Sequence, residues 1–528
     1  MSKFINIKLI SFLSLSVILF HQMQLSSQPS LVWLSQYNGP INSFDQANNV
    51  CIDDSGNVYV TGESNGGSGL NYDYATVKYN SAGAEQWTAR YNGPGDGDDK
   101  SFAVCADKNG NVYVTGSSKG IGNNNMDIAT IKYDNSGVEQ WVVRYYYSAT
   151  SNDIAYGMCI DTSGNIYVAG KNGPLRVIKY NSSGTQVWIA SYDGPSTGGN
   201  NPEVIINDRF GNVLVAGSSD SDFLTLKYNS DGVQQWVTTY NGPSNQSDYI
   251  RAMKTDFNGN VIVTGVSYSS SPDWMTIKYD PNGNEIWSVR NQRSGETYDF
   301  ARDVYIDNTG NVYVTGSQSD VIKLGSYMKT YKYSSSNGAV MWSKSFDTFY
   351  SEYGANIVGD GLSNVIVLYA GVNYNNFRVF KYSSSGQLIW SENLTGIESF
   401  SSVISDDKGN FFVTGGAEAN FVTMKYNEII TGIYSIGNEF PYAFLLDQNF
   451  PNPFNPKTII NYQLSMFNYA SLKVYDVLGN EAAALVNEKQ SAGSYSVEFD
   501  GSGFASGVYF YKLEAGEFTE TKRMVLLK

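Results

Sequence analysis

Histidine is almost absent from this 528-residue chain, since its one histidine, His21, lies within the first 27 residues. Those residues start with Lys3 and Lys8 and continue into a short apolar run, which predicts a secretory signal peptide at 1–27. The mature chain would then contain no histidine, which excludes Ser-His-Asp and Cys-His catalytic groups and histidine-bound metals. We therefore expect a protein that is not an enzyme. Paired carboxylates stay available for acid–base chemistry.

Cysteine, charge and long apolar runs are also scarce. The three cysteines, Cys51, Cys105 and Cys159, lie 54 residues apart at equivalent places in a repeat, too far from one another for a disulfide. After the signal, no run is apolar enough for a membrane-spanning helix, and we expect none. Charged residues make up 16% of the chain and the net charge is −15, which argues against a nucleic-acid partner.

Glycine and aromatic residues, by contrast, are abundant, with 52 Gly, 40 Tyr and an aromatic fraction of 14%. They belong to a repeat that residues 102–145 represent, with four short β-type runs separated by turn residues. The copies lie 46 to 54 residues apart, measured between equivalent turn residues: Gly56, Gly110, Gly164, Gly211, Gly259, Gly310, Ser363 and Gly409. A period near fifty with four strands per unit predicts an all-β fold, a β-propeller.

Two residue types keep fixed places in the repeat. An aspartate three residues before the turn glycine suits a tight turn, because its carboxylate accepts a backbone N–H. A tryptophan occurs once per fourth run, and we expect it to pack between blades. The aspartates are Asp53, Asp107, Asp161, Asp208, Asp256, Asp307, Asp360 and Asp406, and the tryptophans are Trp87, Trp141, Trp188, Trp236, Trp287, Trp342 and Trp390.

The chain has eight copies of the first three runs but only seven of the fourth. The missing run lies at the other end, where residues 31–40 match residues 86–94. We therefore predict that the N-terminal strand completes the last blade beside Lys425 and Tyr426, which would remove open sheet edges and close an eight-bladed ring. Seven blades with an additional unit is the alternative.

These motifs resemble the SBBP family, the β-propeller repeats of secreted bacterial proteins. The resemblance covers residues 31–427 and rests on the pattern Asp-x-x-Gly-Asn-Val-Tyr-Val-Thr-Gly, followed by Thr-x-Lys-Tyr-Asn-x-x-Gly and Gln-Trp. The resemblance implies a fold, but it implies no particular ligand or catalytic activity. The family is named for seven blades, so a count of eight departs from it.

The repeat pattern stops at residue 427, and residues 428–439 are interpreted as a linker. From residue 440 the composition changes, beginning with a proline-rich segment at 448–456 that excludes helix and interior strand. Five short β runs follow, at residues 458–464, 470–476, 493–500, 507–514 and 522–527. Such a series in fewer than about ninety residues predicts a small, Ig-like β-sandwich.

Residues 440–528 resemble the type A C-terminal sorting domain of the type IX secretion system. The resemblance rests on the proline-rich segment, on Val-Tyr-Asp-Val-Leu-Gly at 474–479, on Gly-Val-Tyr-Phe-Tyr-Lys-Leu at 507–513, and on the basic and apolar end at 521–528. It implies a Gram-negative host of the Bacteroidota type, recognition of this domain by the secretion machinery, and a secreted, extracellular or surface-displayed protein.

The loops differ between the two faces of the predicted propeller. Connections between strands two and three, and between blades, vary in length and share one face, where we expect any binding site and its central opening. Asp96, Asp98 and Asp99 lie in one glycine-bearing loop there, and their oxygens suit Ca²⁺, the one cofactor considered. Their spacing does not match an EF-hand, which favours a solvated acidic loop instead.

Aromatic residues are the other candidates on this face. They form two groups whose flat rings suit stacking on sugars, and packing between loops explains them as well: Tyr145, Tyr146 and Tyr147, and Phe349, Tyr350 and Tyr353. We expect a secreted scaffold that binds a polysaccharide or a protein at the cell surface. The alternatives are an extracellular hydrolase or lyase that uses carboxylates in the central opening on a polysaccharide, and a structural component of a surface layer.

Overall fold

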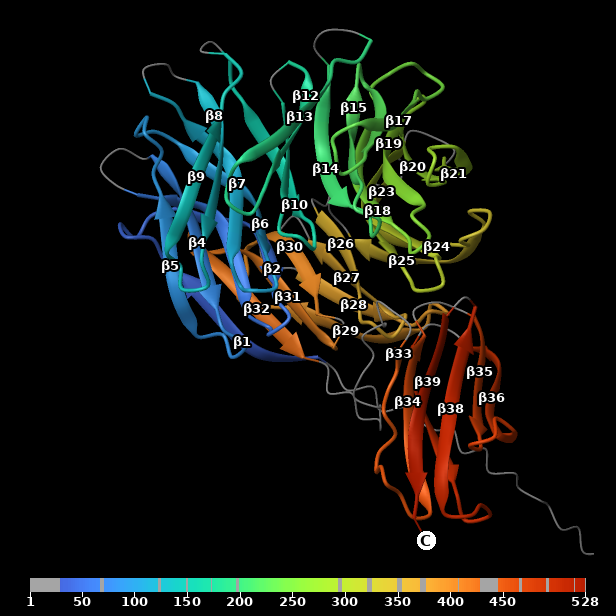
Figure 1. The fold of residues 1–528 in the computed structure, drawn as a ribbon. Coiled ribbons are helices and arrows are strands. Elements are labelled where there is room, and N and C mark those ends of the chain that lie inside the picture. The colour runs from blue at the N-terminus through green and yellow to red at the C-terminus, as the bar shows by residue number, and fades with distance from the viewer. Residues whose placement is uncertain are drawn as a thin grey trace, which may run out of the picture.

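The structure is a computed structural model, and every regular element in the part of the chain that it describes is a β-strand (Figure 1). The described residues are 29–66, 71–121, 125–148, 151–171, 173–195, 199–292, 297–320, 325–348, 354–370, 377–406, 408–427, 445–464, 468–490, 493–516 and 518–527. The expected signal peptide and linker lie outside them. Among the described residues, none belongs to a helix with the length and hydropathy of a membrane span.

Residues 30–427 form a propeller of four-stranded antiparallel sheets, numbered here 1 to 8 in chain order. Sheets 1 to 4 comprise β2 (Asp45–Ile52), β3 (Val58–Asn65), β4 (Tyr72–Tyr79), β5 (Glu85–Tyr91); β6 (Asp99–Ala106), β7 (Val112–Lys119), β8 (Met126–Tyr133), β9 (Glu139–Tyr145); β10 (Ile154–Ile160), β11 (Ile166–Lys171), β12 (Leu175–Tyr180), β13 (Gln186–Tyr192); and β14 (Asn201–Asn207), β15 (Val213–Ser219), β16 (Asp222–Tyr228), β17 (Gln234–Tyr240). Sheets 5 to 7 comprise β18 (Tyr249–Thr255), β19 (Val261–Tyr268), β20 (Pro272–Tyr279), β21 (Glu285–Asn291); β22 (Thr297–Ile306), β23 (Val312–Asp320), β24 (Gly325–Tyr333), β25 (Val340–Thr348); and β26 (Gly354–Gly359), β27 (Val365–Ala370), β28 (Phe377–Tyr382), β29 (Leu388–Leu394).

Sheet 8 combines strands from both ends of the propeller: β30 (Ser399–Ser405), β31 (Asn410–Ala417) and β32 (Asn420–Asn427) with β1 (Ser30–Tyr37). The pairing of β1 with β32 is antiparallel, and Trp33 lies opposite Lys425. This is the strand pairing predicted from the unequal number of runs in the sequence.

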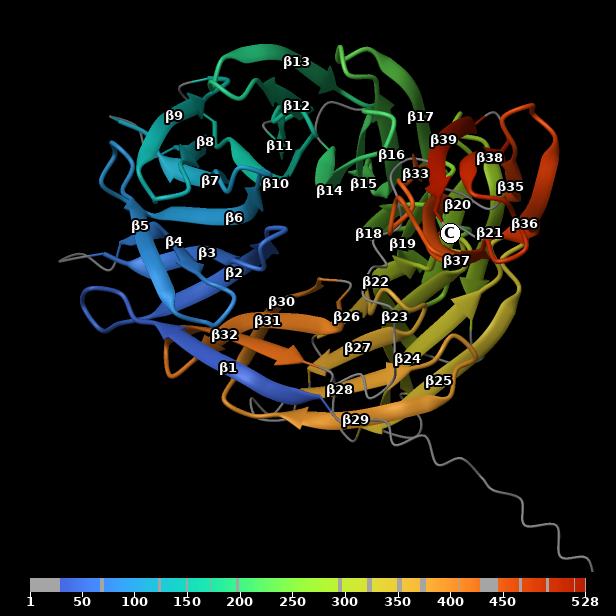
Figure 2. The ribbon, with the colours of Figure 1, turned by 60° about the horizontal axis from the view of Figure 1, so that its bottom comes forward.

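The first strand of each sheet lies nearest the centre, and the fourth lies on the outside (Figure 2). Each innermost strand contacts the innermost strand of the next sheet, and β30 contacts β2. Hydrogen bonds also join sheets 8 and 1, where the Ser401 hydroxyl donates to the Ala47 carbonyl at 2.6 Å and the Asp45 N–H donates to the Ala419 carbonyl at 2.7 Å. The apolar cores lie between neighbouring sheets, as in the cluster that joins Trp33 to β2–β4.

The repeated aspartates cap the turns between the first and second strands. In sheet 2, Asp107 Oδ1 accepts the backbone N–H groups of Asn109 and Asn111, both at 2.9 Å. The same two bonds occur in all eight sheets, as the sequence predicts. This end of the propeller, which also holds the turns between the third and fourth strands, is called the turn face.

The repeated tryptophans pack between sheets, although several are partly exposed rather than fully buried. In sheet 2, Trp141 Nε1 donates to the Ser182 carbonyl in the turn of sheet 3, at 3.2 Å. Lys132, which precedes Tyr133 at the end of β8, donates to the same carbonyl at 3.0 Å. Equivalent tryptophan bonds run from sheet to sheet, from Trp33, Trp87, Trp188, Trp236, Trp287 and Trp342. We call this contact the tryptophan clasp.

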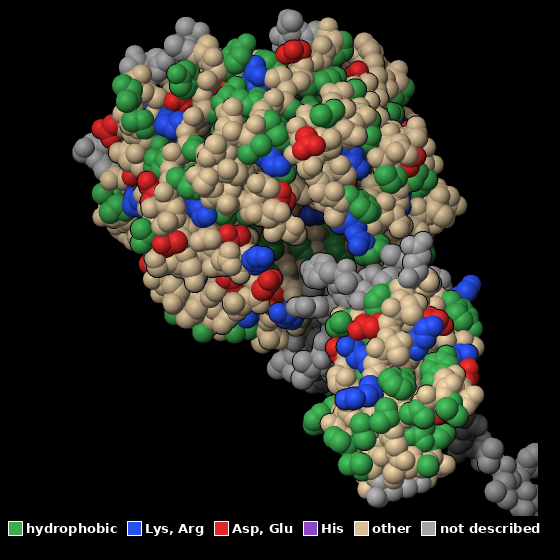
Figure 3. Space-filling model, in the orientation of Figure 1, with side chains coloured by type: hydrophobic (Ala, Val, Ile, Leu, Met, Phe, Trp, Pro, Cys, Tyr) green, Lys and Arg blue, Asp and Glu red, His purple; other side chains and the backbone are tan. Residues whose placement is uncertain are grey.

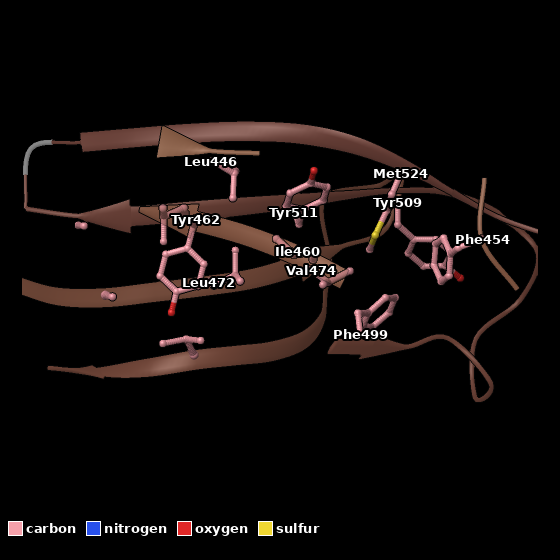
Figure 4. Packing of buried hydrophobic residues seen from close by; sticks show 14 of the residues in the cluster. Leu446, Phe454, Ile460, Tyr462, Leu472, Val474, Phe499, Tyr509, Tyr511 and Met524 are labelled. Atoms are coloured by element: carbon pink, nitrogen blue, oxygen red, sulfur yellow. The ribbon is translucent and has the colours of Figure 1, made fainter. Parts of the chain in front are cut away.

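The C-terminal residues form two packed sheets. One sheet contains β33 (Leu445–Leu446), β34 (Lys457–Leu464) and β37 (Gly493–Asp500), and the other contains β35 (Asn468–Tyr475), β36 (Glu481–Gln490), β38 (Gly507–Ala515) and β39 (Phe518–Leu526). Their core joins Ile460, Tyr462 and Phe499 of the first sheet to Leu472 and Tyr511 of the second (Figure 4). β36 is the one long strand that the sequence analysis did not identify.

Candidate functional site

The loop face is the end of the propeller opposite the turn face, and it carries the connections between sheets. Asp99, at the start of β6, is fully buried there. Its carboxylate accepts the N–H of Gly93 at 2.6 Å and the N–H of Lys119 at 2.9 Å, which ties the loop between sheets 1 and 2 to the end of β7. Burial raises the pKa of Asp99, and these hydrogen bonds oppose that rise.

Asp99 belongs to a repeated structural contact. Asp45 makes the same pair of bonds to Gly39 and Asn65, and Asp248 makes them to Gly242 and Tyr268. In each case the carboxylate accepts the N–H of the residue six positions earlier in the loop between sheets. Asp99 therefore holds the loop in place with both of its oxygens.

The other two acidic residues of this loop are more exposed. Asp96 accepts from the Asn92 side chain at 2.9 Å, and Asp98 accepts the Tyr72 N–H at 3.2 Å. No group of three or more His, Cys, Asp or Glu side chains in the described ranges has an arrangement that would hold a metal ion. Binding of Ca²⁺ by Asp96, Asp98 and Asp99 stays a prediction from the sequence.

The aromatic candidates separate into one described group and one that lies outside the described residues. Tyr145 ends β9 and packs against the core between sheets 2 and 3, whereas Tyr146 and Tyr147 are 67% and 56% exposed. Tyr147 lies under the Arg176 guanidinium, 4.3 Å from the ring centre. Phe349, Tyr350 and Tyr353 lie outside the described residues.

The innermost strands present a set of side chains that the sequence analysis did not single out. In seven of them the strand register shifts by one residue near its start, which is a β-bulge. A bulge inserts an unpaired residue and redirects its side chain. The inserted residues are Asn48, Phe102, Tyr156, Glu203, Arg251, Arg302 and Ser401, and each is at least partly exposed although it lies on an innermost strand.

Four of these bulge residues form a continuous arc across sheets 3 to 6. The guanidinium of Arg251 forms an ion pair with the carboxylate of Glu203 at 3.0 Å. Burial, and next the charge of Glu203, raises the pKa of Tyr156. On the other side, burial and then the charge of Arg251 lower the pKa of Arg302. The arc therefore runs in the order Tyr156, Glu203, Arg251 and Arg302.

An open groove of about 810 Å³ lies beside the arc, between sheets 4 and 5. It is lined by Asn201, Asp220, Asp248 and Tyr249, among others. The Tyr249 ring also lies 4.6 Å from the Arg251 guanidinium, so the groove continues into the arc. A groove of mixed polar and apolar lining that meets aromatic and charged side chains is suited to a ligand with both kinds of surface, such as a sugar chain.

The arc could have been found in the sequence by comparing the repeats with one another. The bulge residue lies five positions before the turn aspartate in each of these copies, as Arg251 does before Asp256 and Arg302 before Asp307. Neighbouring positions are mostly small or apolar, whereas this one changes chemistry from copy to copy. Such variation within a constant frame is typical of binding surfaces.

Two family models match the chain. Residues 448–527 match the secretion system C-terminal sorting domain, and residues 32–69 and 86–123 match the β-propeller repeat. Both resemblances found in the sequence are thus confirmed. The sorting domain indicates a protein that is secreted or held at the cell surface through the type IX secretion system. No curated protein matches the chain.

Solved structures with similar folds have low sequence identity to this chain. Sqt1 from Chaetomium thermophilum has 9% sequence identity and a TM-score of 0.50 over 76% of this chain and 100% of its own, which supports the propeller fold. PorZ of Porphyromonas gingivalis, described as an essential bacterial surface component of the type IX secretion system, has 13% identity and a TM-score of 0.39 over 90% of this chain. This chain spans 64% of that structure.

Proposed function

We propose that the protein is a scaffold at the cell surface that binds a polysaccharide or a protein through its loop face and does not act as an enzyme. The arc of bulge residues carries this proposal. It brings side chains of differing chemistry from successive sheets to one place on a frame of repeated sheets, where they meet an open groove. Binding residues on a rigid frame lose little conformational freedom when a ligand attaches.

The site depends on the arrangement of the sheets around it. We infer that the eight sheets are eight blades of one ring, which the pairing of β1 with β32 closes. We also infer that the C-terminal sheets form an Ig-like sandwich. The sandwich would serve as the contact for the secretion machinery, which leaves the loop face for a ligand outside the cell.

The surface of the molecule suits a ligand of low charge density. Acidic and basic side chains are interspersed on the face seen in Figure 3. The net charge of −15 opposes a densely charged polyanion such as nucleic acid.

Binding of the purified full chain to an array of bacterial and plant polysaccharides, and to whole cells, tests the proposal. We expect binding to at least one surface polymer with the polymer left intact. A polymer that is shortened on incubation would contradict the non-enzymatic assignment, and the absence of binding to any surface component would contradict the scaffold.

A hydrolase is the second candidate, and one observation favours it. Burial, and then the charges of Asp248 and Asp220, raise the pKa of Asp222 at the edge of the groove. A carboxyl group with a raised pKa can act as a general acid. Product analysis by chromatography after incubation with each bound polymer distinguishes the two candidates, and Asp222→Asn would abolish any turnover that depends on this group.

A further inference from the structure

Arg302 lacks an anionic partner among the residues that the structure describes. Its guanidinium forms no hydrogen bond or ion pair with any residue in the described ranges, and its Nε atom is buried without an acceptor. The nearest aromatic ring is Phe300, with the guanidinium 5.6 Å from the ring centre. Guanidinium groups removed from water are normally matched by carboxylates, so an unmatched one is unfavourable in the free protein.

The neighbouring charges do not neutralise Arg302. Asp303 follows it in the chain, but the Asp303 carboxylate accepts the N–H groups of Val304 at 2.8 Å and Ile357 at 3.0 Å instead. Glu203 is engaged by Arg251. Arg251 also has an Nε atom that is buried without an acceptor. The arc thus holds two arginines and one carboxylate, which leaves an excess positive charge inside a strongly acidic protein.

Aromatic rings flank both arginines. Tyr249 lies against Arg251 and lines the groove, Phe300 lies against Arg302, and Tyr156 stands at the other end of the arc. An arginine binds a carboxylate through two parallel N–H bonds, and an aromatic face packs on the apolar face of a sugar ring. The two features together suit a sugar that carries one carboxylate.

We propose that Arg302, with Arg251 beside it, binds the carboxylate of an acidic sugar residue in a surface polysaccharide, with the ring seated between Phe300 and Tyr249. The inference rests on the proposed binding function and specifies its ligand class and site. A uronic acid fits better than a sulfated or phosphorylated polymer, because the local positive charge is small and the whole protein repels dense negative charge.

Titration calorimetry of the full chain with a galacturonic-acid oligomer, and with the same oligomer after methyl esterification, tests the proposal. We expect the acid form to bind at least tenfold more tightly, and its affinity to fall as salt is added. Arg302→Gln should remove that preference, and Arg302→Lys should restore part of it, since lysine keeps the charge but loses the paired N–H geometry. Arg209→Gln is the control, because Arg209 stacks on Phe257 on the turn face.

Stability gives an independent readout. Because Arg302 has no anionic partner among the described residues and is repelled by Arg251, we expect Arg302→Gln to leave the thermal midpoint unchanged or raised, whereas a structural arginine would lower it. A lowered midpoint in this variant would contradict the proposal.

The outcomes separate this proposal from the binding function on which it rests. Equal affinity for the acid and ester forms, or an Arg302→Gln variant that binds as the wild type does, would overturn the site while leaving the scaffold intact. Dependence on Arg302 for polyglutamate but not for the sugar acid would overturn the assignment of a glycan. Failure of the wild-type chain to bind any surface polymer or protein would overturn both.

Discussion

The indole Nε1 of Trp33 donates a hydrogen bond of 3.1 Å to the carbonyl oxygen of Ser81. Trp33 lies on β1, the outer strand of sheet 8, and Ser81 lies in the turn between β4 and β5 of sheet 1. The contact is the tryptophan clasp again, but here it joins the sheet that holds both ends of the propeller to the sheet that starts the repeat. Trp33 is buried, at 8% exposure, whereas Trp141 is partly exposed, and Trp33 packs against Tyr79 and Phe412.

Replacing Trp33 should therefore loosen the join between sheets 8 and 1. We expect Trp33→Ala to lower the free energy of unfolding by about 3–5 kcal/mol, the usual loss for a buried tryptophan. Trp141→Ala is the matched control, because it removes the same clasp between sheets 2 and 3, where the indole is partly exposed. Urea titration followed by circular dichroism measures both. A loss for Trp33→Ala no larger than the loss for Trp141→Ala would contradict a special role at the join.

The steric contact between a turn glycine and the tryptophan of the clasp can be tested by comparison with a turn glycine that has open space beside it. A Cβ at Gly137 would meet the Trp87 indole at 2.7 Å, whereas a Cβ at Gly211 would meet nothing within 4 Å. Both glycines have a φ near +80°, at 85° and 80°, so alanine is strained by about 1–2 kcal/mol at either position. We expect Gly137→Ala to cost an additional 1–3 kcal/mol or so, because the indole must move. Equal unfolding midpoints for the two variants would rule out the steric contact.

The turn aspartates have different partners in different sheets: a tyrosine hydroxyl in some, and a buried lysine in others. In sheet 2, the hydroxyl of Tyr113 donates to Asp107 at 3.2 Å, but the equivalent residue in sheet 5 is Ile262. There Lys278 pairs with Asp256 at 3.0 Å, and both side chains are 4% exposed.

We expect Lys278→Met to lower the free energy of unfolding by about 3 kcal/mol, because Asp256 keeps its buried charge without the cation. Lys132→Met in sheet 2 should lower the free energy of unfolding by less, since the Tyr113 hydroxyl still donates a hydrogen bond to Asp107 there. Chemical denaturation of both variants, and of Lys278→Met combined with Asp256→Asn, provides the measurement. The double variant should recover part of the loss.

A buried tyrosine lies at or next to the end of the third strand of every sheet of the propeller, and such tyrosines make stability sensitive to alkaline pH. Burial raises the pKa of Tyr382 to about 12, so the folded protein holds this proton when the unfolded chain has lost it. The contribution is fully present below the ordinary tyrosine pKa near 10, and stability is lost as the pH rises from there through about 12. Tyr382→Phe removes the titrating group. We therefore expect the urea midpoint of this variant to fall less steeply between pH 9.5 and 11.5 than that of the wild type, and parallel curves would contradict the assignment.

Short-range patterns in the sequence predicted much of the fold. The turn aspartates, the tryptophan positions and the missing fourth run follow from local turn chemistry and from counting, and the pairing of β1 with β32 agrees with them. The role of Asp99 was missed, because its partner Lys119 is distant in the chain. The clue was a loop glycine six positions before each of Asp45, Asp99 and Asp248.

The candidate site was less accessible from the sequence. Arg251 and Arg302 lie 51 positions apart, and only the bulges in β18 and β22 bring them to one arc. A single copy of the repeat gives no sign of its bulge, because the inserted residue can be of any type, and only comparison of the copies shows a position whose chemistry varies. The sequence favours the loop aromatics instead, since binding residues concentrate on variable loops.

The shared sheet at the end of the propeller has a further consequence for how the molecule assembles. Trp33 and Lys425 are separated by about 390 residues, so their strands meet only after most of the chain has been made. Until then β32 presents a bare hydrogen-bonding edge that the first strand of any copy fits equally well. A high local concentration of newly made chains would therefore favour exchange of this strand between two molecules, giving intertwined pairs.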